Sequence, residues 1–151
     1  MLETQISQSF MDSYKAKDEF AVSILRMIKS SILNKKIEKV MPKEDLLPDE
    51  EVLAVLKSEV KKRLDSVQSY TQGGRADLAE TEQKEADFIK KFLPEEMSED
   101  HVREIAVAVI AEMGDLGPSG FGKIMGAVMA KAKGTADGTL VSKVVKEELA
   151  K

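Results

Sequence analysis

The sequence predicts an all-α protein with a helical N-terminal domain of about four helices and a small three-helix C-terminal domain. Two observations support this fold class. Every long apolar segment repeats its apolar residues at three- and four-residue spacing, which is the period of an α-helix. In addition, 42% of the residues are hydrophobic and 33% are charged, whereas only 5% are aromatic. This composition is typical of helix-rich globular chains rather than of disordered or β-rich ones.

The N-terminal domain, residues 1–94, contains four segments with the helical period. The first covers residues 2–16, and Asp18 is the expected N-cap of the second, which continues to about residue 38. The stretch MPKEDLLP ends that helix, and Pro48 followed by three acidic residues begins the third. The third helix stops at Gly73-Gly74, and a fourth follows to about residue 92. The apolar residues expected inside are Ile6, Phe10, Met11, Tyr14, Phe20, Ile24, Leu25, Ile28, Ile32, Val52, Leu53, Leu56, Val60, Leu64, Val67, Leu78, Ala86, Ile89 and Leu93.

Residues 94–97 are the predicted boundary, because they form a short break that contains Pro and lies between two helical patterns. The C-terminal domain, residues 98–151, then contains three short helices. Ser98 and Asp137 are the expected N-caps of the first and the last, and the first should end at Gly114. The apolar residues expected inside are Val102, Ile105, Ala106, Val109, Ile110, Met113, Phe121, Ile124, Met125, Val128, Met129, Leu140, Val141, Val144, Val145 and Leu149.

Small residues form a stripe on the second of these three helices. Gly122, Gly126 and Ala130 are spaced four apart, so they share one face. Residues without a large side chain let another backbone approach closely. Packing against a neighbouring helix is the favoured interpretation, and close approach of a ligand backbone is the alternative.

The stretch GPSGFGKI, residues 117–124, resembles a phosphate-binding P-loop because Gly117, Gly122 and Lys123 have the required spacing. However, Ile124 occupies the position at which a Ser or Thr hydroxyl would coordinate magnesium. The segment before the motif also has a helical period, whereas a P-loop needs a buried strand there. We therefore expect no bound nucleotide and no other cofactor.

The charge is unevenly distributed along the chain. The net charge of −4 argues against general binding of polyanions, so we expect no DNA partner. From Phe121 onward, however, the chain contains six lysines and three acidic residues, so this part has a net charge of +3 and residues 1–120 have a net charge of −7. These lysines could contact RNA phosphates, and a solvated basic face is an equal alternative. Because few aromatic residues accompany them, any RNA contact should be to the backbone. The candidate residues are Lys123, Lys131, Lys133, Lys143 and Lys146.

Residues suited to catalysis are scarce. There is no Cys and only one His, so a Cys/His catalytic pair is impossible, and we interpret His101 as a surface residue. The carboxylates of the fourth helix lack the Glu-x-x-His pattern of a di-iron site, so they indicate a solvated face. We expect no catalytic or metal site. The absence of Cys, of a signal peptide and of a membrane-spanning segment favours the cytoplasm and excludes a membrane partner.

The C-terminal residues GKIMGAVMAKAKGTADGTLVSKVVKEEL resemble the GatB/YqeY family, whose pattern is G-x-V/M-M…K-x-x-G-x-A-D/N-x-x-x-V. The segments KDEFAVSILRMIKSSILNKKIE, EVKKRLDSVQSY, GRADLAETEQKE and FLPEEMSED are similar to the free-standing YqeY-like members, so the resemblance covers nearly the whole chain. Phe92 departs from the Tyr that the family usually has before Leu-Pro, which concerns packing more than function. The residues in register with the pattern are Gly126, Met129, Lys133, Gly134, Ala136, Asp137 and Val141.

The resemblance implies an all-α protein with a small three-helix tail. In the B subunit of tRNA-dependent amidotransferases, a similar tail contacts tRNA, whereas a separate and larger domain performs the chemistry. The family label implies carbon–nitrogen ligation with glutamine as amide donor, yet this chain supplies neither an amidase nucleophile nor an ATP site. We therefore expect a non-catalytic tRNA-binding or amidotransferase-associated protein. The alternatives are a helical protein–protein adaptor and, less favoured, an enzyme in its own right.

Overall fold

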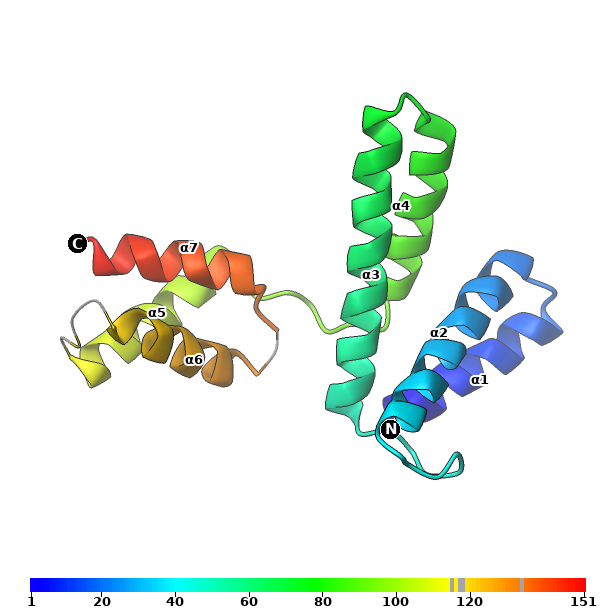
Figure 1. Ribbon diagram of the computed structural model, residues 1–151, viewed down its shortest axis with the longest axis horizontal. Coiled ribbons are helices and arrows are strands. Elements are labelled where there is room, and N and C mark those ends of the chain that lie inside the picture. The colour runs from blue at the N-terminus through cyan, green and yellow to red at the C-terminus, as the bar shows by residue number, and fades with distance from the viewer. Residues whose placement is uncertain (115, 117–118, 134) are drawn as a thin grey trace. The chain divides into compact units, whose positions relative to one another are not determined.

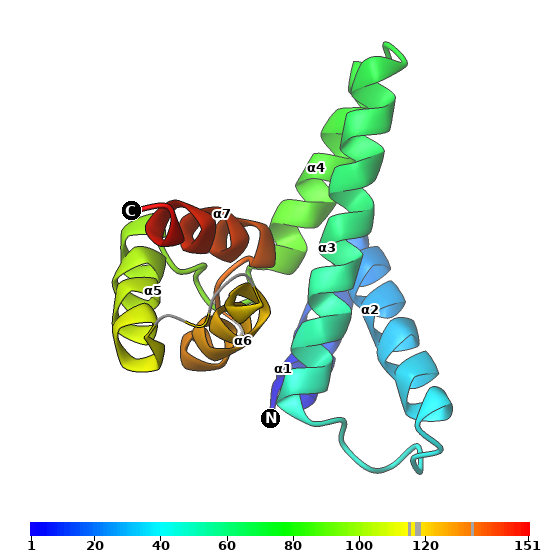
Figure 2. The same ribbon diagram turned by 60° about the vertical axis from the view of Figure 1, so that its left-hand side comes forward.

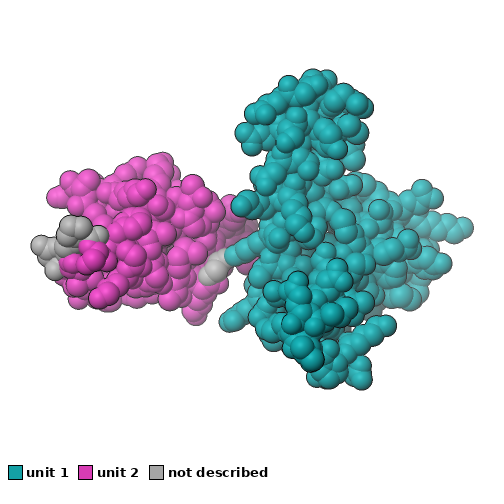
Figure 3. Space-filling view, in the orientation of Figure 1, with its two compact units in different colours: residues 1–93 teal, residues 94–151 magenta. Residues whose placement is uncertain are grey.

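The structure is a computed structural model that describes residues 1–114, 116, 119–133 and 135–151. Within these ranges the chain forms seven α-helices and no strand (Figure 1), which confirms the predicted all-α class. The chain divides into two compact units, residues 1–93 and 94–151, which are coloured separately in Figure 3. No helix in the described ranges is both long and apolar enough to cross a membrane.

The N-terminal unit consists of two helix pairs. The first pair is α1 (Leu2–Lys15) with α2 (Glu19–Glu38), and the second is α3 (Asp49–Gln72) with α4 (Ala76–Lys90). Both α1 and α2 also contact α3, so the two pairs share one core. The far half of the α3–α4 pair extends beyond α1 and α2 (Figures 1 and 2).

Local signals in the sequence set the helix ends of this unit. The carboxylate of Asp18 accepts a hydrogen bond from the Ala21 N–H at 3.1 Å, which confirms the predicted cap of α2. At the other end of the unit, α3 stops at Gly73, and Gly74 has a φ of 72°. Because only glycine adopts this left-handed conformation without strain, it allows the tight turn into α4.

The core of the N-terminal unit contains most of the predicted apolar stripe. The prediction was wrong for Met11, Tyr14, Phe20 and Leu64, which are between 36% and 61% exposed. Leu64 belongs to the second half of α3, where α4 is the main neighbour and one face stays open to solvent. The predicted residues that are buried are Ile6, Ile24, Leu25, Ile28, Ile32, Val52, Leu56, Val60, Ala86 and Ile89.

The C-terminal unit is a three-helix unit in which every helix contacts the other two. It consists of α5 (Glu99–Met113), α6 (Gly120–Ala132) and α7 (Gly138–Leu149). The hydroxyl of Ser98 accepts a hydrogen bond from the His101 N–H at 3.3 Å, which confirms this cap. Gly114 ends α5 with a φ of 68°. Asp137 is the N-cap residue of α7, as expected, although its exposed carboxylate makes no capping hydrogen bond.

Candidate functional site

Two of the five predicted lysines form ion pairs with α5. Lys131 on α6 lies 3.2 Å from a carboxylate oxygen of Glu112, and Lys143 on α7 lies 3.5 Å from a carboxylate oxygen of Glu99. Both lysine side chains are about half exposed. Ion pairs that are this open to water contribute little to stability. The two ammonium groups can therefore exchange these partners for others at low cost.

Lys146 contacts an aromatic ring instead of a carboxylate. Its Nζ atom lies 5.7 Å from the centroid of the Phe121 ring, which is within the range of a cation–π interaction. This contact joins α7 to the start of α6. The three lysines thus have partners at three different helix junctions: Lys131 between α6 and α5, Lys143 between α7 and α5, and Lys146 between α7 and α6.

Lys123 and Lys133 are the predicted lysines that have no side-chain partner among the residues that the structure describes. Both side chains are exposed, and neither makes an ion pair or a side-chain hydrogen bond within the described ranges. Lys133 ends α6 in the left-handed conformation, with a φ of 51° and a ψ of 39°. Its neighbour in the family-like motif, Gly134, lies outside the described residues. Both ammonium groups are therefore open to an outside anion.

The side of α6 that carries Gly122, Gly126 and Ala130 is exposed, and we call these three residues the open face of α6. No described atom lies within 4 Å of a Cβ built at Gly122 or Gly126. The favoured expectation, that this stripe packs against a neighbouring helix, is therefore wrong for α5 and α7. The core side of α6 is formed by other residues, Ile124, Val128 and Ala132.

The open face of α6 has a lysine at each end. Lys123 follows Gly122 directly, and Lys133 is seven residues beyond Gly126, which brings it back to nearly the same side of the helix. The arrangement is a strip of accessible backbone between two unpaired ammonium groups. Such a strip can hold a narrow, negatively charged chain closely, because no side chain keeps the chain away from the helix.

Acidic residues of the C-terminal unit are held by one arginine. Arg103 on α5 donates hydrogen bonds to Glu99 at 3.1 Å, to Glu147 at 2.6 Å and to Glu148 at 2.8 Å. The hydrogen bond from Arg103 lowers the pKa of Glu147, and hydrogen bonds from Lys151 and then Arg103 lower the pKa of Glu148. The cluster joins α5 to α7. The sequence could not indicate the contacts with α7, because Glu147 and Glu148 are more than forty residues from Arg103 along the chain.

Ile124, the last residue of the P-loop-like stretch, is explained by packing in the core. Ile124 is only 2% exposed and belongs to the core of the three-helix unit. The element before the motif is the helix α5 rather than a strand. Gly117 and Pro118 lie outside the described residues. The residue that lacks the magnesium-binding hydroxyl is therefore a core residue of the unit.

Catalytic groups do not converge in the described part of the chain. His101 is exposed in the first turn of α5, as expected for a surface residue. Among the described residues, no group of three or more His, Asp or Glu side chains could hold a metal ion.

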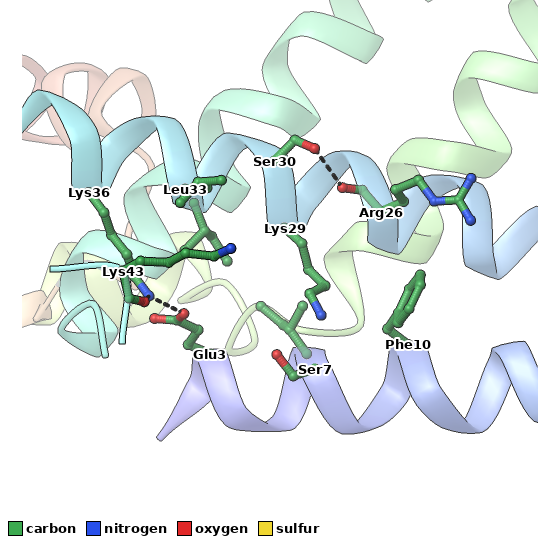
Figure 4. Close-up of a pocket in the computed structure, with 11 residues that line it drawn as sticks. Glu3, Ser7, Phe10, Arg26, Lys29, Ser30, Leu33, Lys36 and Lys43 are labelled. Atoms are coloured by element: carbon green, nitrogen blue, oxygen red, sulfur yellow. Dashed lines mark hydrogen bonds and ion pairs between the residues drawn. The ribbon is translucent and has the colours of Figure 1, made fainter. Parts of the chain in front are cut away.

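The N-terminal unit has a pocket that the sequence did not indicate. Helices α1 and α2 and the loop after α2 surround a cavity of about 280 Å³ (Figure 4). Its lining combines apolar and basic side chains, a combination that appears only when two helices and a loop are brought together. The lining residues include Glu3, Ile6, Ser7, Phe10, Arg26, Lys29, Ile32, Leu33, Lys36 and Lys43.

Comparisons with known proteins identify relatives along the whole chain. An uncharacterised protein of Schizosaccharomyces pombe is 32% identical over 99 residues, which cover 64% of this chain and 76% of that protein. The mitochondrial protein named altered inheritance of mitochondria protein 41 is similar in two fungi. The protein from Pyrenophora tritici-repentis is 23% identical over 95% of this chain and 78% of its own length. The protein from Clavispora lusitaniae is 37% identical over 52% of this chain and 43% of its own length.

A family model covers nearly the whole sequence. The model described as Yqey-like protein matches residues 3–149, which include all seven helices except the first residue of α1. The match agrees with the free-standing type of resemblance rather than with a short shared segment. The chain therefore belongs to the YqeY-like family.

Proposed function

We propose that the three-helix unit binds tRNA through the sugar–phosphate backbone, and that the protein assists tRNA-dependent amidotransferase without performing catalysis itself. One observation carries the proposal. The open face of α6 exposes its backbone between Lys123 and Lys133, and neither lysine has an acidic partner within the described ranges. The link to amidotransferase rests on the resemblance of the C-terminal residues to the B-subunit tail.

The physical argument concerns the shape and the charge of an RNA strand. Phosphates along a strand are regularly spaced anions, and lysines that meet them release condensed counterions and gain affinity without reading sequence. At Gly122 and Gly126 no side chain covers the helix backbone, so an RNA strand can lie close to α6. Its phosphates could then approach Lys123 and Lys133 together. Lys131, Lys143 and Lys146 would add weaker contacts, because each must first leave a partner.

The direct test is tRNA binding by the Lys123→Gln/Lys133→Gln variant, measured by fluorescence anisotropy over a range of salt concentrations. We expect weaker binding with unchanged preference among tRNAs, and a salt slope of log affinity reduced by roughly 0.7–0.9 for each lost contact. The matched control is Lys61→Gln/Lys90→Gln, which removes two exposed lysines of the N-terminal unit. Equal losses from both variants would indicate diffuse attraction and contradict the proposal.

A second variant tests the open face itself without changing charge. Gly126→Leu adds a bulky side chain where no described atom lies within 4 Å, so the fold should tolerate it. If RNA approaches this face closely, the variant should bind tRNA much more weakly while its circular dichroism spectrum stays the same. Unchanged tRNA affinity would show that the strand does not follow the open face.

A protein–protein adaptor is the second candidate function, and exposed apolar residues of the N-terminal unit favour it. Ile37 is 65% exposed and Val40 is 90% exposed, at the end of α2 and just after it. A pull-down with and without ribonuclease separates the two functions: tRNA recovered only without ribonuclease supports the first, and a ribonuclease-resistant protein supports the second.

A cytoplasmic location remains our prediction, which fractionation tests against the mitochondrial location in the names of two relatives.

A further inference from the structure

The pocket between α1 and α2 has an apolar floor and a basic rim. The side chains of Ile6 and Ile32 are at most 2% exposed, and with Phe10 and Leu33 they provide the apolar part of the lining. Arg26, Lys29, Lys36 and Lys43 provide four cations, whereas Glu3 is the only carboxylate in the lining. Residues 1–93 as a whole have a net charge of −1. The positive charge at the pocket is therefore a local concentration and does not reflect the unit as a whole.

Glu3 neutralises one of these four cations, Lys36, and leaves three without a carboxylate partner in the lining. Both of its carboxylate oxygens have partners. One oxygen accepts a hydrogen bond from the ammonium group of Lys36, which is 4% exposed. The other oxygen accepts a hydrogen bond from the Leu47 N–H at 2.7 Å. The Lys36 ammonium also donates to the Lys43 carbonyl at 3.3 Å. This buried group of contacts connects α1, α2 and the following loop, and it builds the closed end of the pocket.

Arg26, Lys29 and Lys43 are the basic side chains of the lining whose charge no carboxylate of the lining pairs, and Figure 4 shows the Arg26 guanidinium directed away from Lys29 and Lys43. The charges left at the pocket itself are those of Lys29 and Lys43. Neither ammonium group forms an ion pair within the described ranges. Lys29 lies over the Phe10 ring, with its Nζ atom 4.8 Å from the ring centroid, so the ring holds this cation against the apolar wall. Figure 4 shows Lys29 pointing from α2 toward α1, with the ammonium end of Lys43 directed into the same space.

We propose that this pocket binds a small amphipathic anion, with its apolar tail on Ile6, Phe10 and Leu33 and its negative head between Lys29 and Lys43. The volume of about 280 Å³ suits a short chain rather than a folded partner. The head can be a carboxylate or a phosphate monoester, because unpaired ammonium groups attract both. An anion without an apolar tail should bind more weakly, because it leaves the apolar floor in contact with water and gains nothing from covering it.

The experiment uses the full chain and four probes, titrated by isothermal calorimetry in the absence of RNA. The probes are octanoate, octyl phosphate, 1-octanol as the uncharged match and acetate as the match without a tail. We expect octanoate or octyl phosphate to bind at least tenfold more tightly than both 1-octanol and acetate. If neither anion exceeds 1-octanol, or if acetate binds as well as octanoate, the proposal is wrong.

Variants locate the binding and separate charge from shape. Lys29→Gln/Lys43→Gln should weaken binding of the preferred anion at least tenfold, toward the level of 1-octanol, whereas Lys61→Gln/Lys90→Gln should leave it unchanged. Ser7→Leu, which places an apolar side chain in the pocket lining, should weaken both anions and 1-octanol together. Circular dichroism checks that each variant is folded. Equal effects of the two lysine pairs, or unchanged binding by Ser7→Leu, would place the anion elsewhere and overturn the proposal.

Discussion

Arg63 and Glu59, one turn apart on α3, form an ion pair inside the N-terminal unit. Nη1 of Arg63 lies 2.9 Å from Oε2 of Glu59, and the two residues are 5% and 6% exposed. Arg63 also donates to Glu85 on α4 at 3.2 Å, and Glu59 accepts from the Ser31 hydroxyl on α2 at 3.1 Å. Two charged residues thus connect three helices in a position where the helical period alone would place apolar side chains.

Removing one member of this pair should strongly destabilise the protein. We expect Arg63→Met to lower the free energy of unfolding by about 3–5 kcal/mol, because it leaves the Glu59 carboxylate buried without its main cation. The control is Arg75→Met, which removes an arginine whose ion pair with Asp77 is exposed on both sides. Urea unfolding followed by circular dichroism measures both. A loss below 1 kcal/mol for Arg63→Met would mean that water or another cation replaces the arginine.

The same pair should make the free energy of unfolding depend on pH in the acidic range. Burial raises the pKa of Glu59, but hydrogen bonds from Arg63, Lys62 and Ser31 outweigh it and leave the pKa below the ordinary value of 4.5. The stabilising contribution is therefore complete above that ordinary value and is lost as the pH falls through the lower pKa of the folded state. The difference in unfolding free energy between the wild type and Glu59→Gln should be constant near pH 7 and should shrink below pH 4.5. A constant difference down to pH 3, on the order of one unit below the ordinary value, would contradict this assignment.

Two glycines of α6 should respond to alanine in opposite directions. A Cβ at Gly120 would overlap the Cβ of Leu116, so Gly120→Ala must displace Leu116 and should destabilise the unit. A Cβ at Gly126 meets no described atom, so Gly126→Ala should stabilise the helix by about 0.5–1 kcal/mol. Thermal unfolding measures both. A destabilised Gly126→Ala variant would show that this face is covered in solution, for example by a partner or a second copy of the chain.

Helix positions could be predicted from the sequence because local residues determine them. Asp18 and Ser98 cap helices through side-chain oxygens, and Gly74 and Gly114 end helices through conformations that glycine favours. The burial of charge could not be predicted in the same way. Lys36 lies in a basic stretch of the sequence, which would ordinarily be exposed to solvent, yet it is only 4% exposed. It is buried because Glu3 on α1 forms an ion pair with it. Such pairs depend on which helices become neighbours.

The candidate site was predictable in composition but not in geometry. The excess of lysines after Phe121 is visible in the sequence, and all five candidates are indeed exposed. The sequence did not indicate that Lys131 and Lys143 have acidic partners on α5, whereas Lys123 and Lys133 have none within the described ranges. The sequence also favoured the wrong interpretation of Gly126, packing against a neighbouring helix. A small residue on a helix suits both close packing and close approach of a ligand, so the residue type alone does not distinguish them. Only the placement of α5 and α7 on the other sides of α6 distinguishes the two.

Limited proteolysis should cut first between the two units. Leu93 donates its backbone N–H to Lys90 at 3.0 Å, and the next backbone hydrogen bond of the chain joins Met97 to Thr135 at 2.8 Å. Glu95 and Glu96 between these points are exposed and have no backbone hydrogen bond within the described ranges. Because a protease must bind several residues in an extended conformation, this stretch is a better substrate than any helix.

A protease that cleaves after glutamate should therefore cut first after Glu95 or Glu96, and intact-mass spectrometry identifies the fragments. The Glu95→Gln/Glu96→Gln variant is the control, and it should survive much longer at the same protease concentration. The competing site is Glu44, in the exposed loop between α2 and α3. That loop is held at Leu47 by the half-buried carboxylate of Glu3, so we expect slower cleavage there. A first cut after Glu44 would show instead that this loop opens more readily than the connection between the units.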